Sequence, residues 1–163
     1  MTIPFVLAFI LMGFTFTITQ VMVIRELLVI FIGNELSIAI ILANWLLLEA
    51  AGSFLLGKRA SELGLGRRGY ALLQMLVSIL LPLTIYAIRS LRDVMGLATG
   101  EGASLVAILF WTAPILAPLG VVDGIMFAVG CRLHSEWARK TASPIGKVYL
   151  YEAAGAGVGG VLY

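Results

Sequence analysis

The sequence contains little charge and almost no cysteine. Only 12% of its 163 residues are Asp, Glu, Lys or Arg, about half the share that is usual in soluble domains. The single cysteine, Cys131, excludes a disulfide within the chain and with it a disulfide-stabilised secreted scaffold. The formal net charge is +2, without the concentrated basic face that nucleic acid requires. We therefore expect no nucleic-acid partner.

Apolar residues dominate the sequence. They account for 61% of the sequence, and the mean hydropathy is +1.05. A soluble domain of this length must still cover itself with a polar surface, and this composition leaves too little for one. The composition predicts an all-α fold, a polytopic bundle of helices that spans a lipid bilayer.

Five apolar runs are candidates for membrane spans, because crossing a bilayer core takes roughly 20 residues. They lie at 3–24, 36–57, 70–88, 103–130 and 148–163, within a single transmembrane domain, 1–163. The first run lacks the basic start and the cleavage site of a signal peptide, so we expect it to be retained. The fifth run is short and has no closing polar flank. We therefore expect it to be truncated, with the chain continuing in a longer protein.

The basic residues give an orientation. Eight of the eleven lie in two connecting segments that share one side of the membrane: Lys58, Arg59, Arg67, Arg68, Arg132, Arg139, Lys140 and Lys147. Cytoplasmic loops carry the excess of Lys and Arg. This pattern predicts that both segments, and the N-terminus, are cytoplasmic.

Three acids fall inside the predicted spans: Glu49, Asp123 and Glu152. An ionisable side chain in lipid is costly and marks a candidate functional site. One interpretation is that each acid pairs with a base near the membrane surface, namely Lys58, Arg132 or Lys147, or caps a helix. The other is that two or more of them form a site for a cation or proton.

A second polar cluster follows the first span and comprises Gln20, Arg25, Glu26 and Glu35. We expect Arg25 to form an ion pair with Glu26 or Glu35 at the outer interface. Such a pair would fix how the first helix returns into the second.

Small residues are placed where helices could approach closely. The candidate helix-packing positions are Gly52, Gly57, Gly120, Gly124, Gly155 and Gly159. The glycines near the C-terminal end also fit a G-x-G-x-x-G spacing, but no strand precedes them, which argues against a nucleotide site.

No pattern in the sequence predicts a catalytic residue, a metal site or a cofactor. Cys131 and His134 lie close together, but two such ligands do not make a zinc site.

Three segments together resemble the N-terminal membrane portion of the fused, membrane-integrated spermidine synthase-like proteins of bacteria. They read QVMVIRELLVIFIGNEL from Gln20, ANWLLLEAAGSFLLGKRA from Ala43 and VYLYEAAGAGVGGVLY from Val148. The positions that carry the resemblance are Gln20, Arg25, Glu26, Gly33, Glu35, Trp45, Glu49, Gly52, Gly57, Tyr149, Glu152, Gly155 and Gly159. In that family a membrane domain precedes a cytoplasmic aminopropyltransferase-like domain. The catalytic motifs of that domain are not within these residues, so enzyme activity is left open.

The resemblance implies a membrane domain that anchors an aminopropyltransferase-like domain and handles polyamine, in the bacterial cytoplasmic (inner) membrane. The implied partners are the lipid bilayer and further helices or a catalytic domain beyond Tyr163, or other subunits. Two alternatives stay open: a segment of a secondary transporter, which would need more helices, and a structural subunit of a membrane assembly.

Overall fold

The computed structural model describes residues 3–98, 100–137 and 144–163, and within them the chain is helical, without strands. The elements are α1 (Ile3–Phe31), α2 (Glu35–Ala51), a π-helical turn η1 (Gly52–Leu56), α3 (Gly57–Glu62), α4 (Arg67–Met95), α5 (Leu105–Trp137) and α6 (Pro144–Leu162). The expected all-α helical bundle is confirmed.

Four helical segments are long and apolar enough to cross a membrane. They are Pro4–Phe31, Glu35–Ala60, Arg67–Met95 and Leu105–Glu136. Large apolar side chains on their outer faces are exposed, as Phe54 is to 82%, and a surface of this kind belongs in lipid. The chain is therefore a membrane protein. The fifth expected span lies in α6, and its crossing of the bilayer stays a prediction.

The helices extend beyond the predicted spans. α1 continues from 24 to Phe31, and α5 continues from 130 to Trp137. Hydropathy locates only the part of a helix that is apolar enough to lie in lipid. The backbone hydrogen bonds of the helix continue past that part, through charged residues such as Arg25. Cys131 and His134 consequently lie in α5 and not in a connecting loop.

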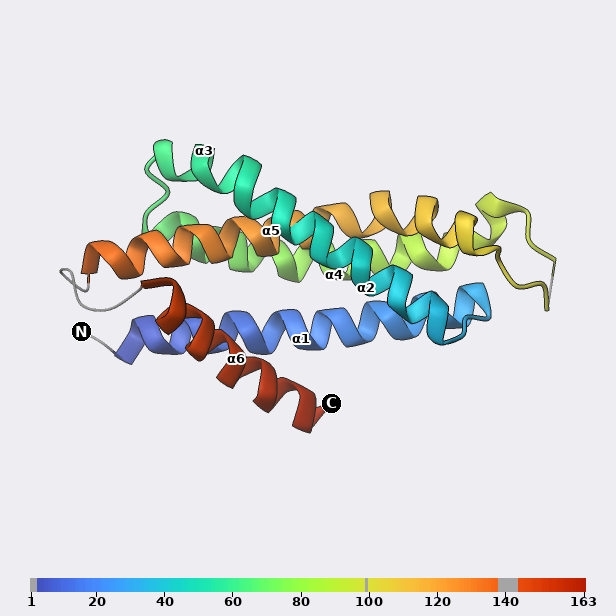
Figure 1. Cartoon of the computed structure of the whole chain (residues 1–163), viewed down its shortest axis with the longest axis horizontal. Coiled ribbons are helices and arrows are strands. Elements are labelled where there is room, and N and C mark those ends of the chain that lie inside the picture. The colour runs from blue at the N-terminus through green and yellow to red at the C-terminus, as the bar shows by residue number, and fades with distance from the viewer. Residues whose placement is uncertain (1–2, 99, 138–143) are drawn as a thin grey trace.

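Two helix pairs cross in close contact, α1 with α6 and α2 with α5 (Figure 1). α4 packs against both α1 and α5 and so joins the two pairs. The buried core between the helices is made of large apolar side chains, including Phe9, Met12, Leu27, Ile88 and Met126. The start of α1, the α3–α4 connection and the end of α5 lie at one end of the bundle, and the α1–α2 turn lies at the other.

Local signals set the helix ends at the α1–α2 turn. Asn34 caps α2: its Oδ1 accepts from the Ser37 amide at 3.2 Å, and Ser37 Oγ accepts from the Asn34 amide at 3.2 Å. This reciprocal capping satisfies amide groups that a helix start leaves unpaired. At the far end of α4, Gly96 adopts a left-handed conformation with φ of 64°, which glycine allows without steric cost.

A π-helical turn interrupts the second span. In η1 the Gly57 amide donates to the carbonyl of Gly52, five residues earlier. A π turn of this kind inserts extra backbone into an α-helix and is frequent at functional sites. The π turn begins three residues after Glu49, and it contacts α5.

Candidate functional site

The structure brings together the three acids of the predicted spans, one from each of three helices. Glu49 lies on α2, Asp123 on α5 and Glu152 on α6. Asp123 is only 4% exposed, while Glu49 and Glu152 are half-buried. The carboxyls of Glu49 and Glu152 are both near enough to act electrostatically on Asp123, and Glu49 acts on Glu152. We call these three residues the acidic cluster.

Glycines at the α2–α5 crossing bring the cluster's backbones into contact. A Cβ added at Gly124 would overlap the main-chain carbonyl of Glu49, and one at Gly52 would overlap the carbonyl of Val121. A Cβ added at Gly57 would lie 2.5 Å from the Cβ of Ala128, and one added at Gly120 would lie 3.0 Å from the Cβ of Leu48. Gly52 in η1, Gly57 in α3, and Gly120 and Gly124 in α5 thus all lie where the second predicted span contacts α5.

The α1–α6 crossing is built in the same way. A Cβ at Gly155 would overlap the carbonyl of Ile10, and one at Gly159 would lie 3.1 Å from the carbonyl of Phe14. On the facing helix, Gly13 meets the carbonyl of Glu152. Gly13 was not predicted from the sequence, because no second glycine lies four positions away on α1. This crossing holds Glu152 in place beside α1.

One oxygen of the buried Asp123 carboxyl lacks a hydrogen-bond partner among the described residues. This oxygen is Oδ1, and the Trp45 side chain interacts with the carboxyl through its indole. Thr19 Oγ1 and Gln74 Oε1 are also buried without a partner in the described part of the chain. An unpaired buried polar group is costly and calls for an explanation, such as a ligand that completes its hydrogen bonds.

The ion pairs of the described residues lie outside the acidic cluster. Where the structure describes side chains, the ion pairs are Arg89–Glu26 and Arg132–Glu136. Arg132 lies 3.6 Å from Glu136, one turn along α5, and also donates to the carbonyl of Leu65. Among the described residues, no ion pair joins Glu49, Asp123 or Glu152 to Lys58 or Lys147. The interpretation that each acid pairs with a base or caps a helix stays a prediction.

The residues of the second expected cluster, at the end of the first span, come from two helices. Gln20, Arg25 and Glu26 lie within α1, whereas Glu35 is the first residue of α2, beyond the turn. Glu26 pairs with Arg89 of α4, with Nη2–Oε1 at 2.8 Å and Nε–Oε2 at 3.0 Å. The expected ion pair of Arg25 with Glu26 or Glu35 is thus replaced by a bond between two helices. Arg89 comes directly after the predicted span 70–88, whereas α4 extends to Met95 and carries Arg89 within the helix.

Sequence reasoning also missed a buried polar contact between α2 and α5. Asn44 Nδ2 donates to Thr112 Oγ1 at 2.6 Å and to the carbonyl of Leu109 at 2.9 Å. Both Asn44 and Thr112 are buried. A lone Asn in an apolar span is a signal for such a bond, although nothing in the sequence identifies its partner.

The arrangement suits a cation better than a tightly coordinated metal ion. Within the described residues, no three His, Cys, Asp or Glu side chains are grouped closely enough to hold a metal. Carboxyls that act on one another without converging on one point can instead bind separate positive charges of a larger ligand. No protein-family model, curated protein or solved structure matches the chain, so the function is inferred from this geometry and from the sequence.

Proposed function

We propose that this chain is a membrane domain that binds a protonated organic amine of the polyamine class at the acidic cluster. The observation that carries the proposal is the buried Asp123 carboxyl, whose Oδ1 lacks a partner among the described residues. Two further carboxyls, on α2 and α6, act on it electrostatically. A bound ammonium group would offset the repulsion among three acids and donate to the unpaired oxygen.

An elongated amine fits the graded exposure of the three acids. Asp123 is buried in the bundle, whereas Glu49 and Glu152 are half-buried on neighbouring helices. A ligand with several ammonium groups can therefore place one at Asp123 and others at Glu49 or Glu152. The resemblance to spermidine synthase-like proteins supports the same ligand class, and it extends the proposal to a domain that anchors an aminopropyltransferase-like partner.

The proposal places the chain in a bacterial inner membrane with its N-terminus in the cytoplasm. The basic residues of α3, of the start of α4 and of the last turns of α5 support this orientation, because these segments lie at one end of the bundle with the start of α1 (Figure 1). Basic residues favour the cytoplasmic side of a membrane.

Calorimetric titration of spermidine into the chain in lipid nanodiscs tests the proposal. We expect Asp123→Asn to weaken binding at least tenfold, and Glu49→Gln and Glu152→Gln to weaken it less. Glu62→Gln is the matched control, because Glu62 is an exposed acid at the end of α3. Equal binding by the wild type and Asp123→Asn, with unchanged helix content, would overturn the proposal. Equal losses in all four variants would also overturn it, since they would indicate general charge attraction.

A further inference from the structure

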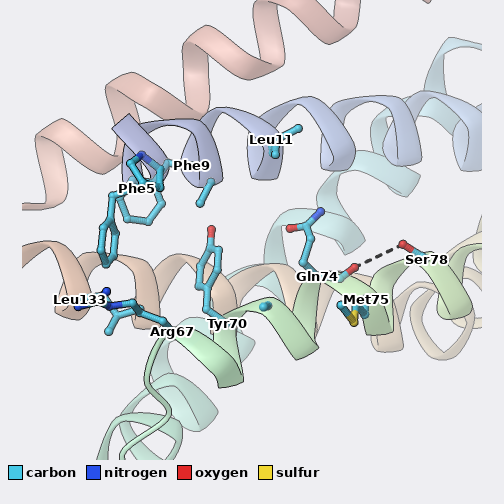
Figure 2. Close-up of a pocket in the computed structure, with 12 residues that line it drawn as sticks. Phe5, Phe9, Leu11, Arg67, Tyr70, Gln74, Met75, Ser78 and Leu133 are labelled. Atoms are coloured by element: carbon cyan, nitrogen blue, oxygen red, sulfur yellow. Dashed lines mark hydrogen bonds between the residues drawn. The ribbon is translucent and has the colours of Figure 1, made fainter. Parts of the chain in front are cut away.

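A cavity of about 450 Å³ lies between α1 and α4, apart from the acidic cluster (Figure 2). Its lining is apolar and includes Phe5, Ala8, Phe9, Ala71, Met75 and Leu133. Leu11 and Met75, which also line it, are 54% and 63% exposed. Both helices are candidate spans, so the cavity opens sideways toward the lipid.

The polar groups on the back wall of the cavity bind α4 to α1. Tyr70 and Gln74 point from α4 toward α1 (Figure 2). The Tyr70 hydroxyl donates to the sulfur of Met12 at 3.1 Å, and Gln74 Nε2 donates to Thr15 Oγ1 at 3.1 Å. These two hydrogen bonds fix the position of α4 relative to α1, so specific contacts between the helices define the walls of the cavity.

One end of the cavity is positively charged. Arg67 lies there, with its guanidinium 5.4 Å from the centre of the Phe5 ring. Among the described residues, no carboxylate lies within ion-pair distance of Arg67. This end therefore attracts a negatively charged group.

The length of the cavity matches one leaflet of a bilayer. It runs along α4 from Arg67 to Ser78, which is about 16 Å at 1.5 Å per residue. The hydrocarbon core of a bilayer is about 30 Å thick, so this is close to half of it. A groove that begins at a cation and ends near mid-membrane has the dimensions of a single acyl chain below its headgroup.

We propose that this cavity binds an anionic phospholipid, with one acyl chain between α1 and α4 and the phosphate at Arg67. Charge complementarity at Arg67 selects the headgroup, and the apolar lining accepts any chain. The site is independent of the acidic cluster, because none of the three acids lines it.

Native mass spectrometry of the full chain in detergent, with phosphatidylglycerol and phosphatidylcholine of identical acyl chains, tests the proposal. We expect the wild type to retain phosphatidylglycerol in preference to phosphatidylcholine. Arg67→Gln should lower that preference about fivefold, the size expected for one basic residue at a membrane surface. Arg68→Gln is the matched control, since Arg68 is the next residue on α4 and does not line the cavity. Ala71→Trp, which fills the cavity, should reduce retention of both lipids.

Each of these measurements can support or overturn the assignment of the cavity to an anionic phospholipid. Equal loss of preference in Arg67→Gln and Arg68→Gln would overturn it, because the headgroup would then respond to surface charge in general. Undiminished retention by Ala71→Trp would place the lipid elsewhere, provided that helix content and elution volume are unchanged. If Ala71→Trp distorts the bundle, Met75→Trp at the exposed rim replaces it with the same expectation. A dimer that Ala71→Trp dissociates would assign the cavity to a second copy of the chain and overturn the lipid assignment.

Discussion

Glu26 and Arg89 join α1 to α4 through two parallel hydrogen bonds, at 2.8 and 3.0 Å, near the end of the bundle opposite the basic residues. Near the start of α4, Tyr70 and Gln74 donate to Met12 and Thr15 of α1. Side-chain bonds thus join α4 to α1 at two separate places, one beside the cavity and one far from it.

We expect Glu26→Gln and Arg89→Gln each to lower the thermal midpoint slightly. The double variant should be no less stable than either single variant, because each change removes the same interaction. A double-mutant cycle in detergent, read by loss of helical circular dichroism, measures this coupling. Additive effects would show that the two side chains stabilise the fold separately.

Gly155→Ala should destabilise the chain by about 2 kcal/mol, because a Cβ there overlaps the backbone of α1 and such overpacking is not easily relieved. Gly157→Ala is the matched control on the same helix: nothing lies within 4 Å of its added Cβ. It should be neutral, or more stable by about 0.5 kcal/mol, because Ala favours helix. Unfolding by titration with a denaturing detergent compares the two. A similar midpoint for both variants would contradict the close crossing of α1 and α6.

Asn44→Leu should destabilise the chain by about 1 kcal/mol through loss of its bonds to α5. Thr112→Val removes the acceptor and should reproduce most of that loss. The same detergent titration gives both values. Serine at position 112 keeps the hydroxyl, so Thr112→Ser should stay closer to the wild type than Thr112→Val does. The opposite order would rule out the hydrogen bond as the source of the effect.

Asp123→Leu should raise the free energy of unfolding by about 1 kcal/mol while it removes amine binding. A buried carboxyl with an unpaired oxygen costs stability, and an apolar residue of similar volume removes that cost. Thermal unfolding without ligand, followed by the spermidine titration, separates the two effects. A lower midpoint for Asp123→Leu would indicate that the carboxylate contributes to the fold through a bond of its own.

Hydropathy alone predicts the helices here, because each apolar run must satisfy its own backbone hydrogen bonds in lipid. The paired glycines of α5 likewise mark a surface for close approach. Which helix approaches is a different matter: nothing local to Gly155 identifies Ile10 as its neighbour, and nothing local to Glu26 identifies Arg89. Those partners follow from the tilt and order of the helices, which depend on the whole bundle. For the same reason, the sequence does not show that Glu49, Asp123 and Glu152 lie close together.

The π turn at Gly52–Leu56 gives the second span one residue more than a regular helix of its length would need. Gly52 and Gly57 are five positions apart and both contact α5, whereas in an α-helix residues four apart share a face. Deleting one residue between them restores the α-helical spacing with both glycines still toward α5. A single-residue deletion, which in most helices would rotate everything beyond it out of register, is at this point a change the bundle can accommodate.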